Sequence, residues 1–240
     1  MPSFSSMEPQ ALAQETREQR DRCDAFRAMS LSLNMARGKP CKDQLDAVAG
    51  LLDALPSTDY RDETGFDLRN YGLVEGIPEA RRLFGALLGV PMDQVLAMGN
   101  SSLNLMFDVM VRCLHLRLPG SERPWKEEPV LKFLCPVPGY DRHFAITKEF
   151  GFEMIPVEMT PDGPDMDAVE RLAGADPAVK GIWCIPVYSN PDGITYSEET
   201  CRRLAAMRTA APDFRIFWDN AYFLHHLDPS NPDRVPDILS

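Results

Sequence analysis

The sequence lacks several features that identify common classes of protein. It has no uncharged apolar stretch long enough to cross a bilayer. Its first residues, MPSFSSMEPQALAQETREQ, have no apolar core of the kind a secretory signal peptide carries. No G-x-G-x-x-G and no P-loop motif occurs, which disfavours enzymes that bind dinucleotides or nucleoside triphosphates. We therefore expect a soluble, cytoplasmic protein that does not associate with membranes.

Basic residues and histidines are also few. The 25 Lys and Arg residues face 36 Asp and Glu residues, for a formal net charge of −11, which argues against nucleic acid as the main partner. Only four histidines occur, and no third metal ligand accompanies His225 and His226. The six cysteines form no C-x-x-C pair. We expect reduced thiols and no metal site.

What remains is the composition of a globular protein, with 44% hydrophobic and 25% charged residues among 240. Residues 8–29 read as an exposed helical arm, and Gly38 and Pro40 break the chain after it. Residues 43–56 predict a helix that ends at Pro56, and 78–89 predict another. Residues 57–76 are polar and rich in turns. These patterns divide the chain near residue 56.

From residue 94 onward, short apolar runs alternate with amphipathic segments. This alternation predicts an α/β fold of three layers, with a mostly parallel sheet between helices. The final residues, DPSNPDRVPDILS, end in a loop, so we expect the chain to be cut short. The expected strands are 94–99, 130–136, 152–159, 179–188 and 214–219, and the expected helices are 101–118, 139–151, 164–174 and 197–211.

One of the expected strands ends in a carboxylate. In IFWDNAYFLHH, Asp219 follows the apolar residues Ile216, Phe217 and Trp218, at the edge where ligands of parallel sheets bind. A carboxylate there either caps a turn or faces a positive group. Because apolar residues follow, we favour a cationic partner, and a protonated pyridine nitrogen is one.

Three further strand ends carry polar or aromatic residues. Ser101 and Ser102 open a helix, where free N–H groups bind anions, although such serines more often serve only as helix caps. Tyr140 follows a Pro-Gly turn and either stacks on a flat ligand or belongs to the core. Asn190 stands in SNPDG, where it either donates to a ligand or only forms a turn.

Taken in order, these motifs resemble the fold-type I pyridoxal-phosphate enzymes, above all the aminotransferases of class I and II. LNMARGKP resembles the family's early Gly-x-Pro loop near the substrate, which includes Gly38. YGLVEGIPEARRLFG, GNSS and DNAY resemble its later motifs. In SNPDG, Asp192 stands where the family has threonine. The sequences MARGKP and GNSSLNLMFD are most similar to a divergent, MocR-like branch of aspartate or alanine–glyoxylate aminotransferases.

The resemblance implies a role for each cofactor-binding residue. Asp219 would pair with the ring nitrogen of pyridoxal 5'-phosphate and keep it protonated. Asn190 and Tyr222 would bond the ring's 3-hydroxyl oxygen, and Tyr140 would cover the ring face. The serines at 101 and 102 would hold the phosphate.

The resemblance also implies how the chain is organised. Tyr71 would reach the phosphate of a neighbouring subunit, so a homodimer is expected. Residues 1–56 would form an N-terminal arm and part of a small domain, and 57–240 an incomplete large domain. The substrates would be an amino acid and a 2-oxo acid. Arg37 and Lys39 slightly favour a dicarboxylic amino acid such as aspartate.

The resemblance further implies a lysine that forms a Schiff base with the cofactor, and an arginine that binds the substrate carboxylate. None of the six lysines matches the family's position, so the chain as printed is expected to be a catalytically incomplete fragment. Two alternatives to an aminotransferase stay open. One is a lyase on the same scaffold, and the other is an effector-binding domain of a transcriptional regulator.

Overall fold

The structure is a computed structural model that describes residues 4–33 and 38–239. It divides into two compact units, Met1–Tyr60 and Arg61–Ser240. The first unit holds helices and no buried residue within them: η1 Phe4–Ser6, α1 Pro9–Ala28, α2 Lys42–Val48 and η2 Ala49–Asp53. The helix predicted over 43–56 is thus present, but its second half is a 3₁₀ helix.

The second unit contains a five-stranded sheet in the order β3-β2-β1-β4-β5. The β1–β2, β1–β4 and β4–β5 pairs are parallel, and only β2–β3 is antiparallel. The mostly parallel sheet is therefore confirmed. Its elements are α3 Pro78–Leu88, η3 Met92–Gln94, α4 Ser102–His115, η4 Trp125–Glu127, β1 Lys132–Val137, α5 Asp141–Glu149, β2 Glu153–Thr160, β3 Gly163–Pro164, α6 Met166–Ala175, β4 Val179–Cys184, α7 Glu198–Ala206 and β5 Arg215–Trp218.

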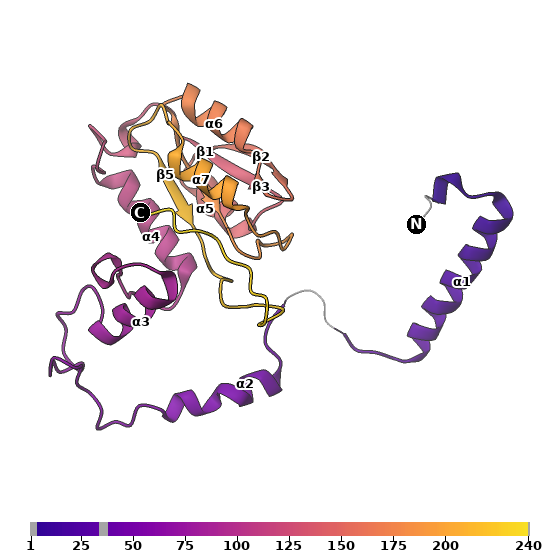
Figure 1. Ribbon diagram of the computed structural model, residues 1–240, viewed down its shortest axis with the longest axis horizontal. Helices are drawn as coiled ribbons and strands as arrows, with labels where there is room; N and C mark the ends of the chain where they lie inside the picture. Colours follow the sequence, from indigo (N-terminus) through magenta and orange to yellow (C-terminus); the bar gives the residue numbers. More distant parts are fainter. Residues whose placement is uncertain (1–3, 34–37, 240) are drawn as a thin grey trace. The chain divides into compact units, whose positions relative to one another are not determined.

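Helices cover both faces of this sheet, as Figure 1 shows for the second unit. Successive residues of a strand point to opposite faces, and Leu134 and Ile182 pack with residues of α6 and α7. Their neighbours Phe133 and Trp183 pack instead with residues of α4 and α5. The result is the three-layer arrangement that the alternation of elements predicted.

The parallel strands bring their carboxyl ends to one edge of the sheet. Cys184 at the end of β4 pairs with Trp218 at the end of β5, and the Asp219 N–H donates to the Cys184 carbonyl oxygen at 2.8 Å. The loops that follow β1, β4 and β5 therefore gather at this edge. The sequence predicted the candidate residues at this edge.

The strand predicted over 94–99 is wrong. Gln94 ends a 3₁₀ helix, and the residues after it pair with no strand within the described parts of the chain. Their backbone groups find other partners: the Ala97 N–H donates to the Glu75 carbonyl, and the Arg81 Nε donates to the Val95 carbonyl, both at 2.9 Å. A short apolar run alone did not distinguish this loop from a strand.

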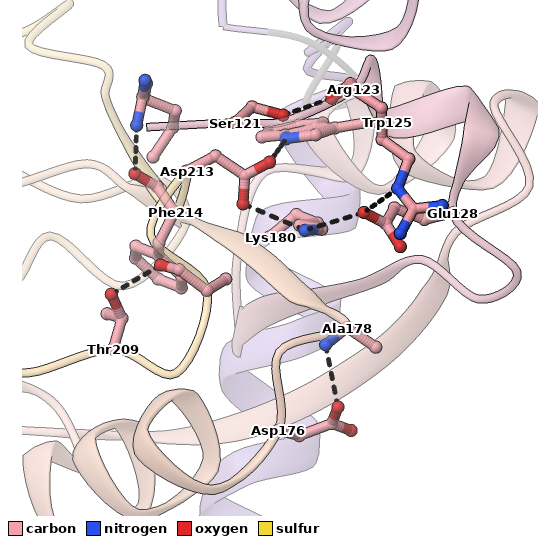
Figure 2. Close-up of polar contacts among 12 residues, drawn as sticks. Ser121, Arg123, Trp125, Glu128, Asp176, Ala178, Lys180, Thr209, Asp213 and Phe214 are labelled. Atoms are coloured by element: carbon pink, nitrogen blue, oxygen red, sulfur yellow. Dashed lines mark hydrogen bonds and ion pairs between the residues drawn. The ribbon is translucent and has the colours of Figure 1, made fainter. Parts of the chain in front are cut away.

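A buried ion pair ties the opposite edge of the sheet together, as Figure 2 shows. Lys180 in β4 donates to Asp213 at 2.9 Å, and the Trp125 indole N–H donates to the other Asp213 oxygen at 2.9 Å. The Glu128 carboxylate lies 3.9 Å from the Lys180 ammonium. Burial raises the pKa of Asp213, but the bonds from Lys180 and Trp125 outweigh it and hold that pKa below the ordinary value.

The described residues contain neither a candidate membrane span nor a candidate metal site. None of their helices is both long and apolar enough to cross a membrane. No group of three or more His, Cys, Asp or Glu side chains among them is arranged to hold a metal ion.

Candidate active site

Asp219 lies directly after β5, with its side chain only 9% exposed. The Nε2 atom of His143, in α5, lies 3.0 Å from the Asp219 Oδ2 atom. A carboxylate accepts hydrogen bonds, so the imidazole N–H must be the donor and the His143 hydrogen sits on Nε2. Asp219 is therefore held by a neutral or charged imidazole, and not by a local arginine.

His143 is itself fixed by the core beneath it. Its ring is stacked on Trp183, with centroids 4.4 Å apart and planes at 11°. The Trp183 indole N–H donates to the Thr147 hydroxyl at 2.8 Å, and that hydroxyl donates to the His143 carbonyl at 2.8 Å. These contacts leave the imidazole little freedom, so the direction of its bond to Asp219 is set in advance.

Tyr140 is the N-cap residue of α5 and lies beside this pair. Its ring meets the His143 ring edge-on, with centroids 5.1 Å apart and planes at 86°. Tyr140 is half-buried rather than part of the core. The aromatic residue and the carboxylate that the sequence singled out are thus connected through His143.

Asn190 and Tyr222 meet across the same edge. The Asn190 Nδ2 donates to the Tyr222 hydroxyl at 3.2 Å, which joins the turn after β4 to the loop after β5. Asp192 accepts from the Ile194 N–H at 3.2 Å, and Gly193 has a φ of 75°, which favours glycine. Aspartate thus closes the turn as a local side-chain acceptor, in the place where the resembling family has threonine.

Ser101 and Ser102 stand at the beginning of α4. Ser101 is the N-cap, and its hydroxyl accepts from the Asn104 N–H at 3.4 Å. The capping role that the sequence left open is therefore present. Within residues 4–33 and 38–239, no hydrogen bond joins either serine to Asp219, Asn190 or Tyr222. The first turn still offers backbone N–H groups to an anion.

The remaining predicted residues are Tyr71, Gly38, Arg37 and Lys39. Tyr71 is 93% exposed. Gly38 belongs to the first unit, and a Cβ atom added to it would meet nothing within 4 Å, so no close approach requires glycine there. Arg37 lies outside the described residues, and Lys39 is exposed.

The lysines of the second unit lie away from the edge that carries Asp219. Lys132 begins β1, and Lys180 follows the first residue of β4. Lys126 lies in η4 before β1, and Lys148 lies at the far end of α5 from Tyr140. Lys39 and Lys42 belong to the first unit. The site built by the second unit thus contains carboxylate, amide, phenol and imidazole groups, but no lysine of that unit.

Two parts of the site were not predicted from the sequence. His143 was missed because its partner Asp219 is 76 residues away along the chain. Tyr188 has a φ of 50°, which is uncommon for a bulky residue, and no local motif predicted this conformation. A histidine three residues after Tyr140, one turn along the expected helix, was the available hint for His143.

Comparisons with known proteins show which family the chain resembles. The family model described as aspartate amino-transferase matches residues 7–240. An aspartate aminotransferase of Corynebacterium glutamicum is 52% identical over 217 residues, which cover 90% of this chain and 49% of that protein. The crystal structure of an aspartate transaminase from Corynebacterium glutamicum is 46% identical with a TM-score of 0.89, over 99% of this chain and 55% of that one.

More distant structures share the fold alone. The crystal structure of an archaeal alanine:glyoxylate aminotransferase is 20% identical, with a TM-score of 0.50 over 77% of this chain. The chain spans about half the length of the curated relatives it matches, with 56% and 49% of them covered.

Proposed function

The chain belongs to the aspartate amino-transferase family, and from this premise we propose that it builds the cofactor-binding part of an aminotransferase that uses pyridoxal 5'-phosphate. The observation that carries the proposal is the Asp219 carboxylate at the end of β5, held by the buried His143. Relatives of about 50% identity named as aspartate aminotransferases support it.

The side chains of the site fit this cofactor. The Asp219 Oδ2 atom is taken by His143, and among the described residues no hydrogen bond is made to its Oδ1 atom, which is left for a ring N–H. A carboxylate so close to full burial needs a positive partner, and a protonated pyridine nitrogen supplies one. Asn190 and Tyr222, already bonded to each other, provide donors for an oxygen on the adjacent side of the ring.

When bound, the cofactor supplies an electron-withdrawing ring that accepts charge from the carbon bearing the amino group. Asp219 would keep the ring nitrogen protonated and so maintain that withdrawal. Tyr140 would cover one face of the ring and exclude water from it. The N–H groups and hydroxyls at the start of α4 would hold the phosphate.

The finer assignments follow from the family. We propose aspartate, or a similar small dicarboxylic amino acid, as the donor and a 2-oxo acid as the acceptor. The lysine and the carboxylate-binding arginine that this reaction requires would come from residues other than those of the second unit. We also propose a homodimer, in which the exposed Tyr71 reaches the partner's site. Six free thiols fit a reducing compartment such as the cytoplasm.

A binding titration tests the proposal directly. Trp183 is stacked on His143, so its fluorescence should be quenched as pyridoxal phosphate is added to the chain. We expect saturable quenching, and weaker binding by about tenfold or more in Asp219→Ala, because a charge-assisted hydrogen bond is lost. Pyridoxal without its phosphate serves as the control ligand. Equal binding of both ligands, or equal binding by both proteins, would contradict the proposal.

The reaction is tested separately by amino-group exchange between aspartate and a 2-oxo acid. We expect exchange only when a protein that contains the chain also supplies the lysine. A lyase on the same scaffold would instead release ammonia and pyruvate from an amino acid that carries a leaving group on its β-carbon, such as serine.

A further inference from the structure

Tyr188 adopts a backbone conformation that its side chain disfavours. Its φ of 50° lies in the left-handed region, which bulky residues rarely occupy because it costs free energy. Such a conformation persists only where surrounding contacts impose it. Tyr188 stands two residues before Asn190, at the entrance to the turn that carries that amide. The contacts of Tyr188 should therefore explain what holds it there.

The Tyr188 hydroxyl bonds to the segment that follows Tyr222, the partner of Asn190. It lies 3.0 Å from the His226 Nδ1 atom and accepts from the Asp233 N–H at 3.1 Å. Because the hydroxyl oxygen already accepts from Asp233, its own hydrogen is available for His226 Nδ1. Tyr222, which bonds Asn190, lies four residues before His226.

A second connection joins the same two segments. The Tyr188 N–H donates to the Thr195 hydroxyl at 3.3 Å, and the Thr195 hydroxyl donates to the Asp233 carboxylate at 2.7 Å. Asp233 thus donates to Tyr188 through its backbone N–H and accepts from Thr195 through its carboxylate. The turn over 188–195 is attached at both ends to the segment over 226–233.

Asn190 belongs to the turn over 188–195, and Tyr222 lies four residues before the segment over 226–233, so the bond between them lies next to these connections. We propose that Tyr188 is a positioning residue, which holds Asn190 and Tyr222 at hydrogen-bonding distance through His226 and Asp233. Tyr188 itself does not contact the ligand. The part of the inference that concerns a ligand rests on the proposed function, in which this pair binds the ring oxygen of pyridoxal phosphate.

Amide hydrogen exchange measured on the chain without cofactor tests these connections by themselves. We call the bonds from Tyr188 to His226 and Asp233 the brace. In Tyr188→Phe the ring is kept and only the hydroxyl is lost. The Asp233 amide loses its acceptor directly. The informative amide is that of His225, which donates to the Tyr222 carbonyl at 2.8 Å and does not touch Tyr188. We expect its exchange to be about fivefold faster, the effect of one hydrogen bond.

Two further variants separate positioning from a general loss of stability. His226→Asn keeps an acceptor near the place of Nδ1 and should retain slow exchange at His225, whereas His226→Ala should behave as Tyr188→Phe does. Thr209→Val removes a hydroxyl bonded to the Ala211 carbonyl, far along the chain from the brace, and serves as the control. Faster exchange at Asp233 alone, with His225 unchanged, would overturn the proposal.

The affinity for pyridoxal phosphate then tests the link to the site. We expect Tyr188→Phe to bind it about fivefold more weakly, while Thr209→Val binds as the unchanged chain does. Normal affinity in Tyr188→Phe would overturn the positioning role and leave the proposed function standing. If the unchanged chain does not bind the cofactor, the proposed function fails, and the His225 exchange still decides whether the brace exists.

Discussion

The Nε2 atom of His143 lies 3.0 Å from the Oδ2 atom of Asp219, and this contact joins the first turns of α5 to the end of β5. His143 lies in α5, which follows β1, and Asp219 follows β5; β1 and β5 lie on opposite sides of β4 in the sheet order. The bond therefore forms only once the sheet is assembled. It makes the carboxylate part of a fixed group that includes Trp183 and Thr147.

Replacing His143 tests the importance of this bond. His143→Phe should keep the stacking on Trp183 and remove only the N–H, so that the Asp219 carboxylate turns more freely. We expect about tenfold weaker binding of pyridoxamine phosphate, since a hydrogen bond to a charged group is worth about 1.5–3 kcal/mol. Fluorescence titration measures the affinity. His115→Gln, at the exposed histidine that contacts Lys126, is the control and should bind normally.

The buried ion pair between Lys180 and Asp213 should affect the free energy of unfolding and leave the affinity for the cofactor unchanged. Asp213→Leu leaves the Lys180 ammonium without its close partner, and we expect a loss of about 3 kcal/mol, the lower end for a broken buried pair because Glu128 lies nearby. The double variant Lys180→Met with Asp213→Leu should recover most of it. Urea denaturation of the four proteins in this cycle gives the values. Additive losses would show that the two residues do not interact.

The pKa of Asp213 makes the stability depend on pH. Since the pKa of Asp213 in the folded chain lies below its ordinary value of 3.8, the carboxylate stabilises the fold at pH values above 3.8. That contribution is lost as the pH falls through the lower folded pKa. Asp213→Asn should therefore flatten the acid side of the curve of unfolding free energy against pH. A curve with an unchanged slope below about pH 4 would count against this role.

The cysteines should differ widely in reactivity. Burial raises the pKa of Cys135 to about 12 and the pKa of Cys113 to about 11, which suppresses their thiolates. Cys23 and Cys41 are exposed. Under native conditions we expect a thiol reagent to label only the exposed pair quickly, with the buried cysteines following after denaturation. Mass mapping of the labelled peptides checks this, and early labelling of Cys135 would contradict its burial.

The sequence predicted the sheet well because a buried parallel strand reads as a continuous apolar run, as FLCPV does in β1. It also placed Asp219 and Asn190 at one edge, since that follows from the direction of parallel strands. The segment 94–99 failed because apolar residues there carry no information about whether a partner strand exists. Side-chain contacts over long separations, such as His143 to Asp219 or Tyr188 to His226, depend on the assembled fold and have no local pattern.

In the proposed function, Asp219 keeps the ring nitrogen of the cofactor protonated. Nuclear magnetic resonance of pyridoxamine phosphate labelled with ¹⁵N in the ring, bound to the chain, reports that proton directly. We predict that the bound ring nitrogen stays protonated at pH values where it is deprotonated in free cofactor, and that Asp219→Asn abolishes the difference. A ring nitrogen that titrates alike when bound and free would contradict the account.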